Sequence, residues 1–230
     1  MNFKQKQEQV FRIIGNSSKQ KPTFTIVDMH NDFEKDDKIC LTTVAFVPPN
    51  MARRIRKEII TPLKKADSRQ YFYPQESMHV TIQNIRVINK PPNFTEKDIE
   101  LVKDAFEEIL SKTEEFSLEL KGLLMPPTSA AIKVYFDEDV NDLILKLRRR
   151  LVEIRVPDDK SYISKDIAIG NITFCRFTTQ PNKRFIEEYN KLKNIDVGKM
   201  DVNKLCLITT NCVCHPNKTK IIKEFGLKRL

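Results

Sequence analysis

The sequence predicts an α+β protein with two lobes that are built alike and face one cleft. The order strand, helix, strand, helix occurs before residue 115 and again after residue 130. In each half the second strand is an apolar run with polar residues at alternate positions: residues 78–82 read Met-His-Val-Thr-Ile and residues 170–174 read Gly-Asn-Ile-Thr-Phe. An element order of this kind favours two mostly antiparallel sheets with helices on their outer faces.

Composition limits the class of protein. The chain has 230 residues, 40% of them hydrophobic, and can bury a core as one large domain or as two small lobes. No run of 18 apolar residues occurs, and the polar first eight residues lack the apolar segment of a secretory signal, so we expect no membrane association. Five cysteines, an odd number scattered along the chain, favour reduced thiols and a cytoplasmic location.

The net charge of +9 favours a partner that carries phosphate groups. Many basic proteins bind no nucleic acid, so the charge alone does not identify the partner. We expect a monomer, and the sequence itself is silent on the oligomeric state.

Apolar spacing and punctuating residues place the elements of the first half. Residues from Phe3 to Ile14 follow helical spacing, and Gly15 is expected to end that helix. Pro62 is expected to kink or end a later helix, and Thr95 begins a sequence that resembles a capping box. The expected elements are a helix at 2–14, a polar connector at 17–37 with an apolar patch at 24–27, a strand at 39–47, a helix at 50–65, a strand at 78–88 and a helix at 95–112.

The second half repeats this order. Pro126 and Pro127 separate two strands, and Pro181 begins a helix. The expected elements are strands at 116–124 and 130–136, a helix at 137–154, a polar loop at 157–165, a strand at 167–177, a helix at 181–193, a strand at 202–212 and a final element of either type at 218–225.

Strand alternation assigns the side chains of the first motif strand to faces. His79, Thr81 and Gln83 should share one face, and Val80 and Ile82 should lie on the other. The first face then carries a titratable imidazole beside a hydroxyl group.

The same alternation applies to the second motif strand. Asn171, Thr173 and Cys175 should share a face, which leaves Arg176 pointing away from that face. This half therefore presents an amide where the first half presents an imidazole.

The run His79-Val80-Thr81 resembles the His-x-Thr motif of the two-histidine (2H) phosphoesterase superfamily, which includes the RNA 2′,3′-cyclic phosphodiesterases, also called 2′-5′ RNA ligases. Members carry the motif twice, once in each lobe. The first copy here fits fully, and the second has Asn171 in place of the second histidine. The resemblance covers roughly residues 38–212 and implies two lobes that face each other across a groove.

This resemblance sets the expected domain organisation. Residues 1–37 form an N-terminal helix and a polar connector, and residues 38–230 form the two-lobed domain, with the first motif at 78–82 and the second at 170–174.

The resemblance also implies a chemistry. Opening a cyclic phosphodiester needs a base for the incoming oxygen and an acid for the leaving oxygen, and imidazole suits both tasks. His79 would be one half of that pair, while Thr81 and Thr173 would donate hydrogen bonds to the phosphate oxygens. The implied substrate is RNA or a nucleotide with a cyclic phosphate or a 2′-5′ linkage.

Asn171 weakens the catalytic prediction, because an amide donates and accepts hydrogen bonds but does not transfer protons at physiological pH. It is therefore predicted to bind substrate. Three alternatives stay open: a slow phosphodiesterase, an enzyme whose second proton carrier comes from elsewhere, or a non-catalytic RNA or nucleotide binder. The sequence favours the enzyme. His30 and His215 are the other histidines that could supply a proton.

Two further features are candidates for binding. Tyr71 and Tyr73 could stack on a nucleobase, although aromatic residues beside a proline more often pack inside. Cys212 and Cys214, followed by His215, lack the paired Cys-x-x-Cys spacing of zinc sites, so we expect no metal and no cofactor.

Overall fold

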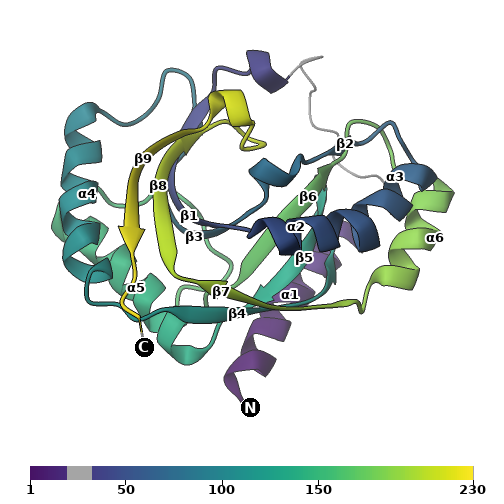
Figure 1. Cartoon of the computed structure of the whole chain (residues 1–230), viewed down its shortest axis with the longest axis horizontal. Helices are drawn as coiled ribbons and strands as arrows, with labels where there is room; N and C mark the ends of the chain where they lie inside the picture. The colour runs from purple at the N-terminus through teal and green to yellow at the C-terminus, as the bar shows by residue number, and fades with distance from the viewer. Residues whose placement is uncertain (20–32, 230) are drawn as a thin grey trace.

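The computed structural model describes residues 1–19 and 33–229, and it consists of two antiparallel sheets with helices packed against them (Figure 1). The predicted α+β architecture with two similar lobes is confirmed. Sheet A has the strand order β3-β1-β8-β9, from β1 (Ile39–Phe46), β3 (His79–Asn89), β8 (Lys204–Thr210) and β9 (Lys220–Gly226). Sheet B has the order β2-β6-β5-β4-β7, from β2 (Tyr71–Phe72), β4 (Phe116–Leu124), β5 (Ser129–Tyr135), β6 (Gly170–Arg176) and β7 (Asp196–Val202).

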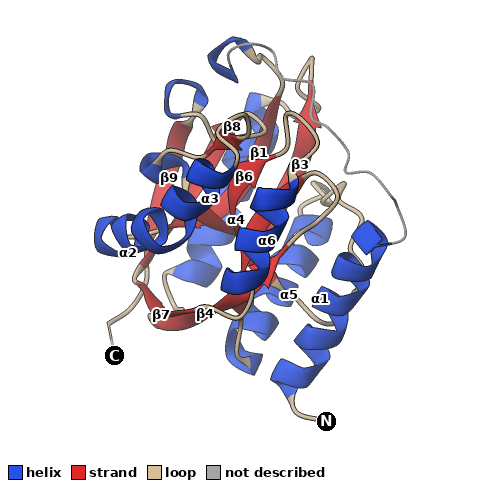
Figure 2. Cartoon of the chain, turned by 90° about the vertical axis from the view of Figure 1, so that its right-hand side faces the viewer, coloured by secondary structure: helices blue, strands red, loops and turns tan. Residues whose placement is uncertain are grey.

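Different helices contact the two sheets, and Figure 2 shows the helices around the strands. Helices α4 and α5 pack on each other and against β9 and β3 of sheet A, while α2 contacts β7 and α6 contacts β4 of sheet B. The helices are α1 (Phe3–Lys19), α2 (Pro49–Ile55), α3 (Thr61–Ala66), α4 (Glu96–Leu110), α5 (Glu138–Glu153) and α6 (Lys183–Leu192), with a π turn η2 (Arg56–Ile60) and 3₁₀ turns η1 (Phe33–Lys35), η3 (Gln75–Ser77) and η4 (Pro216–Lys218). No helix in the described part of the chain is both long and apolar enough to cross a membrane.

The apolar positions of both motif strands lie in one continuous core. Val80 and Ile82 of β3 and Ile172 and Phe174 of β6 are all at most 4% exposed and belong to that core. Burying a side chain of this size contributes about 1.5–3 kcal/mol, so this packing fixes which face of each strand remains polar.

Local sequence signals set several element boundaries. The capping box at α4 is present, because the Asp98 backbone N–H donates to Thr95 Oγ1 and the Thr95 backbone N–H donates to Asp98 Oδ2. Pro62 lies in the first turn of α3, directly after the π turn, where the missing N–H of proline is tolerated.

Other boundaries differ from the sequence prediction. Gly15 does not end the first helix, which continues to Lys19. The strand predicted from residue 202 is preceded by a separate strand, β7, which ends at Val202 and pairs with β4, and the final element is the strand β9. The apolar patch at 24–27 lies outside the described residues.

Gly170, the first residue of β6, is packed too closely to accept a side chain. A Cβ at this position would lie 2.7 Å from Cζ of the buried Phe136 and 3.1 Å from Cβ of Val134. We expect Gly170→Ala to lower the free energy of unfolding by about 1–3 kcal/mol, the usual cost of overpacking, as measured by urea denaturation. Gly226→Ala is the matched control, since a Cβ there meets nothing within 4 Å. Equal stability of the two variants would contradict the prediction.

Candidate active site

An extra residue interrupts the pairing of β6 with β5. Ala131 pairs with Thr173, but the adjacent Ala130 pairs with Cys175. Because adjacent residues of β5 face opposite sides, this bulge places Thr173 and Cys175 on opposite faces. Cys175 is fully buried, so the prediction that it shares the face of Thr173 is wrong.

The same bulge moves Arg176 to the polar face. Arg176 pairs with Ser129, which lies two residues from the partner of Thr173 and therefore on the same face. The prediction that Arg176 points away from Asn171 and Thr173 is thus also wrong. Strict alternation predicts the wrong face here, because the extra residue moves the side chains that follow it to the opposite face of the sheet.

A bulge occurs at the equivalent place in the first motif strand. Val44 of β1 pairs with Thr81, and the adjacent Thr43 pairs with Gln83. Gln83 is consequently turned away from the face of Thr81 and is 1% exposed, with its Nε2 donating to the Asp158 carboxylate at 2.7 Å. The predicted grouping of Gln83 with Thr81 is wrong for the same reason as that of Cys175.

The two strands therefore present matching polar rows. The first row is His79, Thr81 and Asn84, since Asn84 pairs with Thr42, which shares the face of Val44. The second row is Asn171, Thr173 and Arg176. In each row the second member lies two positions after the first, and the third lies five positions after the first. β3 and β6 contact each other although they belong to different sheets, so the two rows lie close together.

Hydrogen bonds fix the ring of His79. Nδ1 lies 2.8 Å from the carbonyl oxygen of Ser77, and because a carbonyl only accepts, Nδ1 carries the proton of that bond. The Ser77 hydroxyl in turn donates to the Cys214 carbonyl at 2.7 Å. Nε2 is then the ring nitrogen that carries no proton in the neutral imidazole, and His79 as a residue is partly exposed.

The thiol of Cys214 lies beside His79 and alters its ionisation. Burial lowers the pKa of His79, but the interaction with Cys214 and the Ser77 carbonyl outweighs burial, and the net shift is upward. For Cys214, burial raises the pKa, while His79 and the hydroxyl of Thr219 outweigh it and lower the pKa. Cys214 has a φ of +50°, an uncommon conformation for a residue other than glycine.

Arg176 brings a positive charge to the second row. Nε donates to the Tyr73 hydroxyl at 3.1 Å, Nη1 to Thr128 Oγ1 at 3.2 Å and Nη2 to the Cys212 carbonyl at 3.3 Å. These bonds use three of the five N–H groups of the guanidinium, and the others have no partner among the described residues. The positive charge of Arg176 opposes the upward shift in the pKa of His79 but does not outweigh it.

The other predicted site residues occupy distinct environments. Asn171 is exposed, and its Nδ2 donates to Thr173 Oγ1 at 3.1 Å. Thr81 is half-buried on the face of His79. Tyr73 is 5% exposed, and its hydroxyl accepts the hydrogen bond from Arg176. The ring of Tyr71 packs against the ring of Tyr73, with centroids 5.6 Å apart.

The remaining histidines do not join the rows in the described part of the chain. Nδ1 of His215 accepts a hydrogen bond from the Asn217 backbone and so caps a 3₁₀ turn. His30 lies outside the described residues. Within residues 1–19 and 33–229, no three His, Cys, Asp or Glu side chains gather where they could hold a metal ion.

Two hollows in the surface of the described residues are lined by residues other than those of the rows. One of about 390 Å³ is lined by Arg56, Lys64 and Lys65 next to Tyr73, and the other, of about 470 Å³, lies at the start of α1. Neither contains His79 or Asn171, so the chemistry of the rows, and not the size of a hollow, identifies the site.

Solved structures share this fold, and a curated protein is similar in sequence. No protein-family model matches the chain. The chain is 26% identical over 180 residues to an RNA 2′,3′-cyclic phosphodiesterase of Aquifex aeolicus, and the match covers 77% of this chain and 89% of that protein. The crystal structure of TT0787 of Thermus thermophilus matches with a TM-score of 0.61 at 15% identity, over 82% of this chain and 97% of that one. The structure of Escherichia coli LigT complexed with 3′-AMP matches with a TM-score of 0.53 at 12% identity, over 84% and 99%.

These similarities support the 2H phosphoesterase superfamily as the family of this chain. The two motif strands carry matching bulges, but only the first carries a histidine. Asn171, in place of the second histidine, is where the chain departs from the motif pattern of that superfamily.

Removal of the Cys214 thiol should change the titration of His79. Because the thiol favours the protonated imidazole, Cys214→Ala should move the pKa of His79 downward, so that the neutral imidazole persists to lower pH. An NMR titration of the His79 ring measures this. Cys206→Ala is the control, since Cys206 is equally buried and contacts Glu224 instead. An unchanged or higher midpoint in Cys214→Ala would contradict the assigned interaction.

Proposed function

We propose that this protein is a 2H phosphodiesterase that opens a cyclic phosphate, or cleaves a 2′-5′ phosphodiester, in RNA or a nucleotide. The observation that carries the proposal is the pair of matching polar rows on β3 and β6, with an oriented imidazole in one of them. The name of the Aquifex aeolicus relative and the LigT complex with 3′-AMP support the same class of substrate.

His79 would carry the proton in this reaction. With Nδ1 bonded to Ser77, Nε2 of the neutral ring can accept a proton from the attacking water as that water approaches phosphorus. The proton then leaves through solvent after the phosphate ring has opened. General base catalysis of this type contributes about 10²–10⁴-fold to the rate.

The hydroxyls of Thr81 and Thr173 would hold the non-bridging oxygens of the phosphoryl group. Arg176 would add positive charge, and its guanidinium is held by hydrogen bonds to Tyr73, Thr128 and the Cys212 carbonyl. Donors held in place before the reaction stabilise the charge that develops in the transition state without reorganisation.

Asn171 would bind the substrate without moving a proton. Its amide bonds to Thr173 and can orient either the phosphate or a ribose hydroxyl. The absence of an imidazole at this position would make a slow enzyme, because one general acid or base is missing and the remaining groups are intact.

If the protein is a phosphodiesterase, two substitutions should change its turnover in opposite directions. His79→Ala should lower the turnover of nucleoside 2′,3′-cyclic monophosphates by about 10²-fold or more, and Asn171→His should raise it by about 10²-fold by supplying the second imidazole. Turnover is measured by chromatography of the nucleoside monophosphates released. Undiminished turnover in His79→Ala would contradict the proposal. Failure of Asn171→His alone would show that the second row is not aligned for proton transfer.

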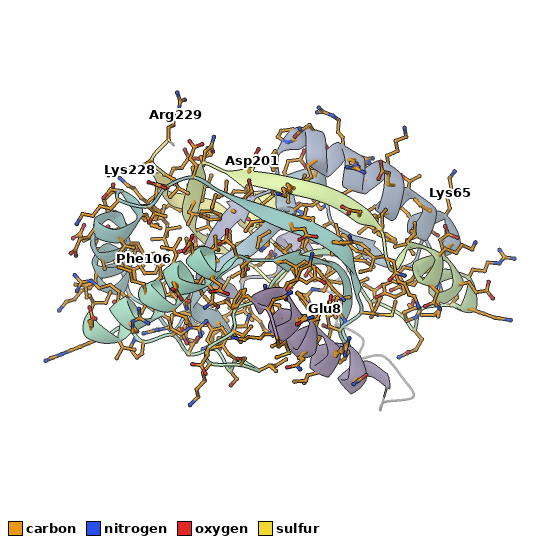
Figure 3. The ribbon with its side chains drawn as sticks, turned by 90° about the horizontal axis from the view of Figure 1, so that it is seen from below. Glu8, Lys65, Phe106, Asp201, Lys228 and Arg229 are labelled. Carbon is orange, nitrogen blue, oxygen red and sulfur yellow. The ribbon has the colours of Figure 1, made fainter. Side chains whose placement is uncertain are left out.

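A second candidate function is a non-catalytic binder of RNA, and the basic hollow beside Tyr73 favours it. Arg56, Lys64 and Lys65 line this hollow and are exposed, and Lys65 extends into solvent in Figure 3. Basic groups gathered in this hollow would bind the phosphates of a chain longer than one nucleotide.

Charge reversal in this hollow tests binding of an RNA chain. Lys64→Glu/Lys65→Glu should weaken binding of an oligoribonucleotide ending in a 2′,3′-cyclic phosphate and should reduce the slope of log K against log salt by about 1 for each lost phosphate contact. Fluorescence anisotropy at several salt concentrations measures both. Lys112→Glu/Lys220→Glu changes the charge equally on exposed residues elsewhere and should leave binding closer to that of the parent. Equal losses in the two variants would indicate only a general effect of net charge. Tight binding without turnover in the parent would favour the binder over the enzyme.

A further inference from the structure

The loop between α5 and β6 lies along the free edge of sheet A. β3 is an outer strand of that sheet, so the backbone groups along one of its sides have no partner strand there. On β3 the Val87 N–H donates to the Asp159 carboxylate of the loop at 2.7 Å, and Asn93 Nδ2 donates to the other oxygen of that carboxylate. Asp159 thus fixes the loop at the edge of the sheet.

The residues just before Asp159 are bound on the face of β3 that is opposite the first row. Gln83 and Arg86 both lie on that face, because their partners in β1 are two positions apart and include no partner of a row residue. Arg86 Nη1 donates to the Pro157 carbonyl, and Gln83 Nε2 donates to the Asp158 carboxylate at 2.7 Å. The loop therefore reaches the edge of the sheet from the face opposite the first row.

Lys160 lies at the tip of this loop. The Tyr162 hydroxyl donates to the Asp158 carboxylate at 3.2 Å and closes the loop, with Lys160 midway between the two. Arg148 supplies the counter-ion of Asp158, since its Nε lies 3.5 Å from the carboxylate. The ammonium of Lys160, in contrast, has no hydrogen bond or ion pair with another described residue.

Lys160 is accessible to solvent and is also surrounded by protein. The residue is exposed, but burial of its ammonium lowers its pKa. Arg148 and Arg176 lower this pKa further, whereas Cys40 and Asp158 raise it. The charge of Arg176, in the second row on sheet B, therefore acts on the tip of a loop that is bound to sheet A.

Cys40 shows which face of sheet A the ammonium acts on. Cys40 lies two positions before the β1 partner of Asn84, so its side chain is on the face of the first row. Burial and Cys214 raise the pKa of the Cys40 thiol to about 11, against an opposing effect of Lys160. Cys214 is also the thiol that interacts with His79. Lys160 thus acts on the face that carries the first row, although its loop comes from the other face.

Two cations therefore act on each other with no carboxylate to compensate them. Among the described residues, the guanidinium of Arg176 bonds only to hydroxyl and carbonyl groups. Lys160 has no ion pair, and the nearby Asp158 is already paired with Arg148. An anion that binds between like charges removes their repulsion and is attracted by both.

We infer that Lys160 binds the phosphoryl group of the substrate from sheet A, while Arg176 binds it from sheet B. The inference rests on the proposed function and adds a residue that lies outside both motifs. The first row offers an imidazole, a hydroxyl and an amide but no permanent cation, and Lys160 supplies one. The ammonium of lysine is a compact charge with three donors and suits a phosphate.

Equilibrium binding of adenosine 3′-monophosphate (3′-AMP) tests this role. Lys160→Met should weaken binding about tenfold or more, as expected for the loss of one hydrogen bond between charged groups. Lys160→Arg keeps the charge and should stay within about threefold of the parent. Adenosine has no phosphate and should bind the parent and Lys160→Met equally. Isothermal titration calorimetry at about 0.15 M salt measures each affinity while long-range effects of net charge are screened.

Lys165→Met is the matched control, because Lys165 is an exposed residue of the same loop and its loss changes the net charge equally. It should bind 3′-AMP as the parent does. Three results overturn the inference: Lys160→Met binds 3′-AMP like the parent, the two lysine variants lose affinity equally, or the parent binds 3′-AMP no better than adenosine. Thermal denaturation should give the same melting temperature for parent and variants, so that a loss of affinity does not reflect unfolding.

These outcomes are distinguishable from failure of the proposed function. Binding of 3′-AMP reports on Lys160 without any turnover, whereas the proposed function is tested by the turnover of His79→Ala. If His79→Ala abolishes turnover and Lys160→Met binds 3′-AMP normally, the phosphodiesterase proposal stands and the role of Lys160 fails. If His79→Ala leaves turnover unchanged, the proposed function itself fails.

Discussion

One extra residue in each motif strand determines which side chains meet at the site. Without the bulge in β6, alternation would place Cys175 beside Thr173 and send Arg176 into the core, where an unpaired guanidinium would be costly. With it, Arg176 joins the polar row and Cys175 fills the core. The bulge in β3 has the matching effect on Gln83 and Asn84. The duplication of the two lobes thus extends to an irregularity of the backbone, which supports a common geometric requirement in both rows.

The segment around Cys212 and Cys214 joins the two rows. Its carbonyl groups accept hydrogen bonds from Tyr73 and Arg176 on one side and from Ser77 on the other. The imidazole of the first row and the guanidinium of the second row are therefore held by the same short stretch of backbone. A change in this segment would alter the orientation of both. The same segment brings the Cys214 thiol beside His79, where it favours the protonated imidazole.

The sequence predicts much of this architecture, because apolar periodicity and turn residues are local signals. The repeated order of strands and helices, the capping box at Thr95 and the burial of the apolar face of each motif strand follow from them. The position of Arg176 could not be predicted, since a bulge depends on pairing with a distant strand and leaves no mark in the alternation of one strand. The contact of Cys214 with His79 and the packing of α1 on β5 also join segments that are far apart in the sequence. No local sequence signal predicts them. Local patterns do not indicate the strands β2 and β7, because β2 spans only two residues and β7 carries several polar residues.

The central claim is that the two rows converge on a single phosphoryl group. The most direct measurement is a crystal structure of the protein with a bound nucleoside 3′-monophosphate. The phosphate should lie between His79 and Asn171, with its oxygens within hydrogen-bonding distance of Thr81 and Thr173. A phosphate bound away from both rows, or in contact with only one of them, would contradict the claim.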